Sequence, residues 1–370
     1  MASAFEVASS FTRWALGNNL VPPLPAGMEG EYLANVTPVQ VSPEGEDVLR
    51  TRSISSVVFN DPESKVFVYT EKRVTQKELE RLPQLIAGCD VVYPHGTLDD
   101  LGGDIQNAQG SGFTMLNVPN IGQAYCCGSS VSPGNEASAG TMGALVRSGD
   151  GTIFGLTNNH VTGGCNHSAI GLPILAPGVL DVSANSLIPF TIGFHERVLP
   201  YALGTTGNVN IAENTDAALF KIQNGNWVSS MQGLAYDTPQ IVTNPLEGLT
   251  VEKVGRTTGH TKGKIVGREL RPIRVKATSG RNSFQAVIMF PGVFIVHGDH
   301  RPFSEGGDSG SLVVATHPNG TKTAVGIVFA GGQDSLAPGG KRTSILPIGP
   351  ILNRLGVTLV GGHNVTTPST

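Results

Sequence analysis

Between residues 140 and 360 the chain consists of short apolar runs separated by glycine. Thr152–Leu156, Ala217–Ile222 and Leu312–Ala315 are examples. Each run has the length of a β-strand and is too short for a helix, which usually needs about 10 residues or more. Because such runs follow one another without helices between them, the pattern predicts antiparallel β-barrels or a sandwich. In this region only Pro347–Leu355 has the pattern of a short C-terminal helix.

The composition also favours a mostly β protein. Glycine accounts for 48 of the 370 residues and charged residues for 15%. The glycines follow no Gly-X-Y period, and 39% hydrophobic residues are too many for a disordered chain. Collagen-like and unfolded classes are therefore excluded. A helical bundle is disfavoured because helix surfaces are normally rich in Glu, Lys, Arg and Ala.

The pattern divides the chain into five predicted parts. Residues 1–60 are rich in Pro, Gly and Ala and are expected to form an irregular arm. Residues 61–96 predict a small β-α-β unit. Residues 97–137 are rich in Gly, Ser and Pro and are expected to be a connector. The predicted barrels occupy residues 138–360, and residues 361–370 are expected to be a flexible tail.

The β-α-β unit is predicted from local signals. Lys65–Thr70 alternates apolar and β-branched residues, as a strand does. Thr75 is followed three residues later by Glu78, which is the spacing of a capping box at a helix start. Cys89–Tyr93 then returns as a strand. In the arm before this unit, only Phe11–Leu16 suggests a short helix.

Charge and targeting signals limit the partners. The net charge of −4, from 25 basic and 29 acidic residues, creates no overall field that would attract a nucleic acid or a membrane. No apolar run approaches the ~18 residues that cross a bilayer. The N-terminus lacks the basic and apolar regions of a signal peptide, so we expect a cytoplasmic protein. The expected partner is a protein or peptide substrate, and a homo-oligomer is compatible with the sequence.

The four cysteines predict neither a disulfide framework nor a zinc site. Cys126 and Cys127 are adjacent, Cys89 and Cys165 are isolated, and no C-x-x-C pair is present. The two histidines that flank Asp299 have no third ligand at metal spacing. We therefore expect no metal ion and no cofactor.

Nine basic residues lie between Lys253 and Arg281, with a single acid, Glu269, among them. Two interpretations are open at this point. The segment is either a solvated hairpin or a landing site for an acidic part of a partner or substrate.

One motif contains a candidate nucleophile. The run Glu305-Gly-Gly-Asp-Ser-Gly-Ser-Leu places Ser309 after two glycines. Such glycines allow a turn in which the N–H groups of Gly307 and Ser309 face one point, where an oxyanion could be held. An ordinary glycine-rich turn would have the same letters.

Two further motifs supply a candidate base and its partner. His160 follows the predicted strand Thr152–Leu156, and imidazole is the natural general base near neutral pH. Asp216 begins the apolar run Ala217–Ile222, where it can be buried and accept the His160 Nδ1–H. Taken singly, each would more often be a surface histidine or an ordinary aspartate at a strand end.

Together the three motifs point to one family. The order His160, Asp216, Ser309 is the chain order of chymotrypsin-type enzymes. The sequences Leu-Thr-Asn-Asn-His, Thr-Asp-Ala-Ala-Leu and Gly-Asp-Ser-Gly-Ser stand in matching places. Residues 140–360 thus resemble the trypsin-like (chymotrypsin-fold) serine peptidases. This resemblance implies two six-stranded antiparallel β-barrels with the site in the cleft between them.

Three segments resemble a smaller group within this family. Gly140–Ser148, Val254–Gly263 and Val325–Gly332 look like the intracellular plant narrow-leaf proteins and their bacterial relatives. The β-α-β unit also looks like the leading segment of the bacterial members.

The resemblance implies a role for each matching residue. His160 would be the general base, Asp216 its orienting partner and Ser309 the nucleophile. The N–H groups of Gly307 and Ser309 would form the oxyanion hole. Because no activation site is visible near Gly140, we expect no trypsin-style zymogen cleavage. Asp308 would then need a partner other than a new N-terminus.

The resemblance also implies where a substrate would bind. Phe329, Ala330 and Gly331 would form the edge strand that pairs with the substrate backbone. Phe303 and Ser304 would lie near the S1 pocket, which receives the side chain before the cleaved bond. Because Phe303 stands where trypsin-like pockets carry an acid, cleavage after Arg or Lys is not expected.

We therefore expect an intracellular serine endopeptidase that uses a Ser-His-Asp triad and an acyl-enzyme. The alternative is a binding or regulatory protein on the same fold whose site is inactive or gated. A Cys-His enzyme that uses Cys165, Cys126 or Cys127 is a weaker alternative. Cys165 lies five residues from His160 in the sequence and has no glycine turn of its own.

Overall fold

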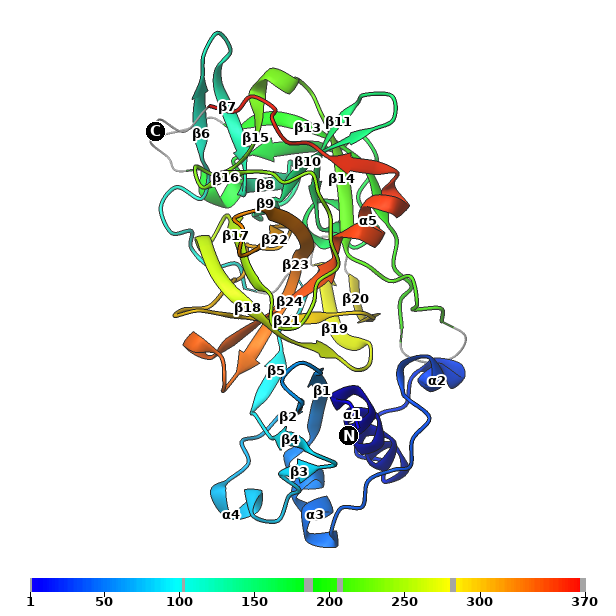
Figure 1. Ribbon diagram of the computed structural model, residues 1–370. Helices are drawn as coiled ribbons and strands as arrows, with labels where there is room; N and C mark the ends of the chain where they lie inside the picture. Colours follow the sequence, from blue (N-terminus) through cyan, green and yellow to red (C-terminus); the bar gives the residue numbers. More distant parts are fainter. Residues whose placement is uncertain (1, 102–103, 183–188, 205–208, 280–283, 367–370) are drawn as a thin grey trace.

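The computed structural model describes residues 2–101, 104–182, 189–204, 209–279 and 284–366. It shows an elongated arrangement of three parts (Figure 1). One β-barrel lies at one end, a second barrel lies in the middle, and an N-terminal unit covers the far end of the second barrel.

The first barrel is built from β8, which lies within the predicted connector, and from strands that follow the connector. Its strands are β8 (Ser129–Pro133), β9 (Gly140–Met142), β10 (Ala144–Ser148), β11 (Ile153–Thr157), β12 (Pro173–Ala176), β13 (Phe190–Leu199) and β14 (Ala217–Ile222), with β25 (Val357–Leu359) beside β10. They pair in the order β25-β10-β11-β14-β13-β12-β8-β9. Only Gly143 separates β9 from β10, so the strand order returns to its start and the barrel has six strands, with β9 and β10 as one bent strand.

The second barrel closes by hydrogen bonds alone. Its strands are β17 (Thr250–Gly255), β18 (Gly259–Glu269), β21 (Phe294–Gly298), β22 (Leu312–Thr316), β23 (Lys322–Asp334) and β24 (Lys341–Pro347). They pair in the order β17-β22-β23-β24-β21-β18, and β17 also pairs with β18. Helix α5 (Ile348–Leu355) follows β24, as predicted. The chymotrypsin-like double-barrel fold expected from the sequence is confirmed.

Two smaller sheets extend the barrels. One contains β6 (Met115–Val118), β7 (Gly122–Cys127), β15 (Val228–Gln232) and β16 (Tyr236–Asp237). The other is the hairpin of β19 (Ile273–Ser279) and β20 (Phe284–Phe290). The structure therefore differs from the predicted connector over 97–137, because this range holds β6, β7 and β8. Strands β7 and β8 pair with strands more than 40 residues away in the chain, and β6 pairs with β7, so short-range turn residues did not reveal them.

The expectation of an irregular arm over residues 1–60 is wrong. This range forms α1 (Ala4–Gly17), α2 (Glu29–Tyr32), α3 (Pro43–Arg52) and β1 (Ile54–Asn60). Helix α1 begins with a capping box between Ser3 and Glu6, and its apolar face buries Phe11 and Trp14. The Ser3–Glu6 spacing of a capping box is present in the sequence. The prediction of an irregular arm gave more weight to the proline and glycine content of residues 1–60.

The β-α-β unit exists in a smaller form than predicted. Strand β2 (Lys65–Thr70) and the Thr75–Glu78 capping box match the prediction. Helix α4 (Gln76–Leu79) ends after one turn, because Pro83 disfavours helical backbone just before it. Strand β3 (Leu85–Ile86) then forms a hairpin with β4 (Cys89–Val92), which runs parallel to β2.

The N-terminal unit is continuous with the second barrel. Strand β1 pairs with β2 on one side and with β18 of the barrel on the other, where Val58 lies opposite Glu269. Strand β5 (Gly96–Leu98) pairs with β23 of the same barrel. One sheet therefore runs from the barrel into the unit.

The expected tail is also partly ordered. His363 N–H donates to Ser230 Oγ at 3.0 Å, and Asn364 Nδ2 donates to the Val228 carbonyl at 2.8 Å. Residues 361–366 thus lie against β15. Residues 367–370 fall outside the described part of the chain.

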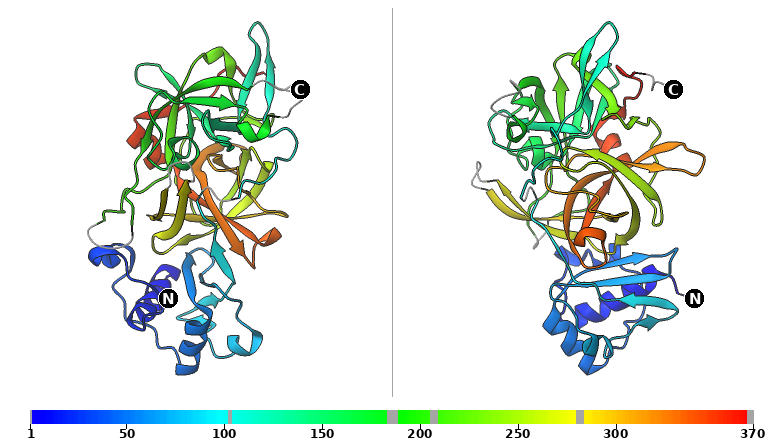
Figure 2. Two further views of the ribbon diagram at one scale, coloured as in Figure 1. Left: turned by 180° about the vertical axis from the view of Figure 1, so that it is seen from behind. Right: turned by 90° about the vertical axis from the view of Figure 1, so that its left-hand side faces the viewer.

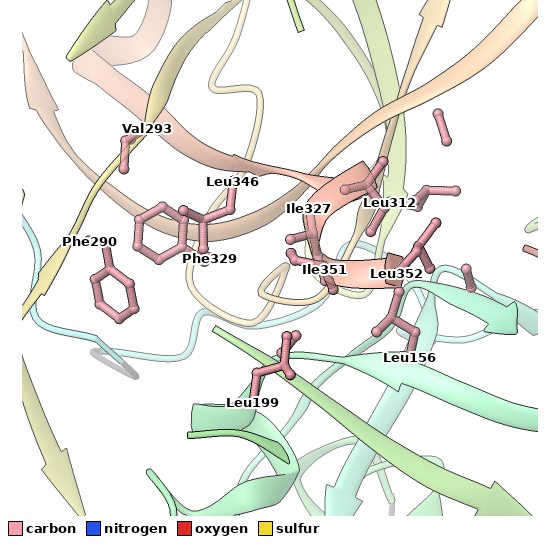
Figure 3. Packing of buried hydrophobic residues seen from close by; sticks show 14 of the residues in the cluster. Leu156, Leu199, Phe290, Val293, Leu312, Ile327, Phe329, Leu346, Ile351 and Leu352 are labelled. Carbon is pink, nitrogen blue, oxygen red and sulfur yellow. The ribbon is translucent and has the colours of Figure 1, made fainter. Parts of the chain in front are cut away.

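The two barrels share one buried apolar cluster (Figure 3). Leu156 and Leu199 of the first barrel meet Leu312 and Ile327 of the second, with α5 beside them. Burial of such side chains stabilises a fold by about 25 cal/mol per Å² of apolar surface. This shared core fixes the two walls of the cleft relative to each other. None of the described helices is long and apolar enough to cross a membrane.

Replacing Glu269 by glutamine should change how stability depends on pH. Burial raises the pKa of Glu269 to about 7, although Arg342 Nη1 lies 3.5 Å away and opposes this shift. Because the folded-state pKa lies above the unfolded value, the stabilising contribution is complete below about pH 4.5 and is lost as the pH rises through 7. Between pH 4.5 and pH 7 the free energy of unfolding of the wild type should fall by up to about 3 kcal/mol. That of Glu269→Gln should not fall, because glutamine does not titrate.

Melting curves at about pH 5 and about pH 8 measure this difference. The exposed control Glu44→Gln should follow the wild type. A constant difference between the wild type and Glu269→Gln at both pH values would contradict the assignment.

Candidate active site

A cleft of about 920 Å³ lies where the two barrels meet. His160 and Cys165 line it from the first barrel. Ser304–Gly307, Ser309 and Val328–Gly332 line it from the second barrel. The cleft thus contains two of the three predicted catalytic residues, and the third lies directly behind His160.

His160 and Asp216 meet because their strands are neighbours. His160 lies in a single helical turn, Asn159–Gly163, after β11, and Asp216 lies just before β14. Strands β11 and β14 are antiparallel, so the end of one lies beside the start of the other. Asn158 Nδ2 donates to the Asp216 carbonyl at 2.7 Å and holds the two segments together.

One carboxylate holds both the backbone and the ring of the histidine. Asp216 Oδ1 accepts the main-chain N–H of His160 at 3.1 Å, and its Oδ2 lies 2.5 Å from His160 Nδ1. Asp216 is fully buried. A carboxylate accepts only, so it selects the tautomer with the proton on Nδ1 and leaves Nε2 free to accept a proton.

Hydrogen bonds fix the two peptides that carry the N–H groups of Gly307 and Ser309 in the glycine turn. The Gly306 carbonyl accepts hydrogen bonds from Thr257 Oγ1 at 2.8 Å and from the Gln106 N–H at 3.0 Å. This carbonyl belongs to the same peptide as the Gly307 N–H. The Asp308 carbonyl, in the same peptide as the Ser309 N–H, accepts Ser311 Oγ at 2.6 Å. In a trans peptide the N–H points opposite to the carbonyl, so both N–H groups are fixed in direction.

Both N–H groups remain available. Within the described residues, neither the Gly307 nor the Ser309 N–H donates to a protein acceptor. Gly307 has φ +101°, and a Cβ there would lie 2.4 Å from Thr257 Oγ1. Only glycine fits this position without strain. Thr141 of β9 ties the turn to the first barrel, because its N–H donates to the Ser309 carbonyl and its Oγ1 to the Gly307 carbonyl.

Asp308 has the internal partner that the sequence required. Lys253 Nζ of β17 lies 3.1 Å from Asp308 Oδ2, and both side chains are fully buried. The main-chain N–H groups of Thr257, Thr258 and Glu305 also donate to this carboxylate. Burial lowers the pKa of Lys253, and the charge of Asp308 opposes that shift. The turn is therefore built without chain cleavage.

The basic segment runs through β17, β18 and β19, where Lys262, Arg268 and Lys276 are exposed, and the landing-site interpretation stays a prediction. Lys253 is buried on Asp308, and Arg256 is buried in an ion pair with Asp181. Further along, Lys264 pairs with Glu63 and Arg271 with Glu29, both in the N-terminal unit. The charges hold separate parts of the fold together. Arg281 lies outside the described residues.

The prediction for Phe303 is wrong, whereas Ser304 does line the cleft. Phe303 is 1% exposed and packs among the apolar side chains inside the second barrel. Ser304 Oγ and Thr343 Oγ1 lie 2.6 Å apart at the cleft wall. Glu305 and Lys341 form an ion pair at the same wall. The Phe303 side chain is directed into the core because its neighbours there are apolar.

The predicted substrate edge, Phe329–Gly331, also lines the cleft. The side chain of Phe329 is buried and packs on Phe290 with ring centroids 5.0 Å apart (Figure 3). Only its backbone can therefore face a substrate. Strand pairing between β23 and β24 shifts between Val328 and Ala330, so Phe329 has no residue opposite it on β24.

The cysteines offer no alternative nucleophile. All four are free thiols in buried positions. Burial raises the pKa of Cys165 to about 11 and that of Cys126 to about 12. A thiol reacts as its thiolate, so these groups are poor nucleophiles near neutral pH. The described residues contain no group of three or more metal-ligating side chains.

The chain is similar to known proteins in both sequence and structure. Residues 232–359 match the family described as the Nal1 C-terminal domain. The strand order gives the chain a chymotrypsin-like double-barrel fold. The chain is 25% identical over 290 residues to Protein NARROW LEAF 1 of Oryza sativa subsp. japonica, which covers 72% of this chain and 48% of the relative. The chain thus spans about half the length of that curated relative.

Several solved structures are also similar. Thermobifida fusca Protease A is 20% identical, with a TM-score of 0.40, and covers 64% of this chain and 98% of its own. A glutamic acid specific serine protease is 20% identical, with a TM-score of 0.41, and covers 64% and 100%. The Cellulomonas bogoriensis chymotrypsin is 18% identical, with a TM-score of 0.38, and covers 64% and 97%.

Sequence reasoning missed several residues that position this site. Lys253, Thr141 and Asn158 act through hydrogen bonds to residues far away in the chain. A lysine within the apolar run around Val251–Val254 was the one available signal, because a lysine is rarely buried without a partner.

Replacing Lys253 by methionine should destabilise the protein strongly. The substitution leaves the fully buried Asp308 without its positive partner, which typically costs about 3–5 kcal/mol. The double variant Lys253→Met with Asp308→Asn should recover most of this loss, because no charge is then left unpaired. Urea unfolding of both variants measures the effect, with the exposed Lys262→Met as the control. A Lys253→Met protein as stable as the wild type would contradict the assignment.

Proposed function

We propose that this protein is a serine peptidase that hydrolyses peptide bonds of a protein or peptide substrate inside the cell. One observation carries the proposal. A fully buried carboxylate, Asp216, binds both the main-chain N–H and Nδ1 of His160, and that histidine lines the same cleft as Ser309. A histidine held in this way serves as a general base rather than as a surface residue.

The reaction follows from the geometry. Ser309 Oγ adds to the carbonyl carbon of the substrate while His160 Nε2 takes the serine proton. The N–H groups of Gly307 and Ser309 stabilise the negative charge on the carbonyl oxygen. The C–N bond then breaks, and His160 gives its proton to the leaving amine. Water attacks the resulting acyl-enzyme, again with His160 as the base, and frees Ser309.

The cellular location is part of the proposal. The four buried cysteines are free, which is compatible with a reducing compartment.

Ser309→Ala should abolish peptide hydrolysis. Loss of the nucleophile lowers kcat by about 10⁴–10⁶-fold in serine peptidases of this kind. Asp216→Asn should lower kcat by about 10⁴-fold with the fold intact, because an amide no longer selects the tautomer with a proton on Nδ1. Turnover of a peptide mixture, read by mass spectrometry, measures both effects.

The control is Ser148→Ala, at the last residue of β10. This variant should hydrolyse the mixture as fast as the wild type. An alkyl fluorophosphonate should label wild-type Ser309 and leave Ser309→Ala unlabelled. Failure to label the wild type would favour the alternative of an inactive or gated binding protein.

A further inference from the structure

The chain itself occupies part of the strand edge at which a substrate would bind. Strand β5 pairs antiparallel with the far end of β23, with Leu98 opposite Gly332 and Thr97 opposite Gln333. Asp99 continues this line, and its N–H donates to the Gly331 carbonyl at 2.9 Å. The segment therefore approaches Ser309 along the path that the N-terminal half of a bound peptide would take.

The segment leaves this edge before it reaches the nucleophile. Leu101 N–H donates to the Lys276 carbonyl at 2.6 Å, and Leu101 forms a bridge with Ala277 of β19. The Gly331 carbonyl therefore accepts a hydrogen bond from this segment. Within the described residues, the backbone of Phe329 is not paired with it. The turn at Ser309 lies beside Phe329, because Gly310 N–H donates to the Val328 carbonyl at 2.9 Å.

The spacing of an antiparallel ladder sets the length of chain that fits. Residues that exchange hydrogen bonds recur at every second position along each strand. If the residue before the cleaved bond lies opposite Phe329, the third residue before that bond would lie opposite Gly331. Asp99 already holds the Gly331 carbonyl. Room therefore remains for about two residues before the cleaved bond.

Several contacts hold residues 95–101, which contain β5, in place. Ser55 Oγ donates to the Gly96 carbonyl at 2.8 Å, and the Leu101 side chain is 1% exposed in the main core. A Cβ at Gly96 would lie 2.6 Å from the ring of Tyr69. His95 and Ser335 exchange two hydrogen bonds just before β5. Displacing β5 would break all of these contacts at once, so the segment acts as a fixed wall.

We infer that β5 and Asp99 are the specificity-determining element of this cleft and limit the substrate to about two residues on the amino side of the cleaved bond. The inference rests on the proposed function and narrows it. The endopeptidase expected from the sequence becomes a peptidase that removes short N-terminal pieces from peptides. Its substrate class is a polypeptide with an accessible amino end.

Two probes that differ only in length test this inference. Both carry a free amino group, alanine residues and a C-terminal diphenyl aminophosphonate, and they present two or four residues to the cleft. Ser309 Oγ bonds to phosphorus while His160 takes the serine proton, and the P–O bond to one phenoxide breaks. His160 then gives this proton to the phenoxide, which leaves as phenol. The rate of labelling is read from the mass of the intact protein.

The wild type should react with the two-residue probe at least about tenfold faster than with the four-residue probe. A tenfold ratio corresponds to about 1.4 kcal/mol, the scale of one or two lost hydrogen bonds. In Gly332→Ala the ratio should fall toward one, because a Cβ there would lie 1.9 Å from the Thr97 carbonyl oxygen and would force β5 away. Gly149→Ala adds the same methyl group in open space and should keep the wild-type ratio.

The outcomes separate the inference from the proposed function. A wild-type ratio near or below one, including failure of both peptide probes, overturns the inference. If an alkyl fluorophosphonate labels Ser309 in the same preparation, the proposed function stands. Absence of that labelling overturns the proposed function itself. Should Gly332→Ala not fold, Asp99→Pro removes the N–H donor to Gly331 and should shift the ratio in the same direction.

Discussion

The ion pair between Asp308 and Lys253 is the interaction on which the site depends. Asp308 lies between the two residues whose N–H groups would hold an oxyanion, and it is buried with no access to water. An unpaired carboxylate in that position would be strongly unfavourable. Lys253 and three backbone N–H groups compensate the charge, and in doing so they fix the path of the chain from Glu305 to Ser309.

Contacts between the barrels complete the arrangement. Thr141 of the first barrel binds the backbone of the glycine turn in the second, while Asp216 holds His160 in the first. The shared apolar core then sets the distance between the two walls. The arrangement of the cleft therefore depends on packing well outside it, because His160 belongs to one barrel and Ser309 to the other.

The N-terminal part has a direct connection to the cleft. It adds β1 to the edge of the second barrel and delivers β5 to the strand that lines the site. Parts of the expected irregular arm and connector thus belong to the same sheet. Sequence patterns did not predict β1 and β5, because these strands pair with residues some 200 positions away in the chain. Local composition does not indicate which distant residues will pair.

The sequence by itself determined the fold class and the identity of the candidate catalytic residues. The identities and order of His160, Asp216 and Ser309, and the period of the apolar runs, are local features that a linear reading preserves. The tertiary structure alone decided that Lys253 neutralises Asp308, that Phe303 points into the core, and that Asp99 binds the Gly331 carbonyl. These three contacts depend on which distant segments pack together. Residues of the same type become buried or exposed according to that packing, which the sequence does not state.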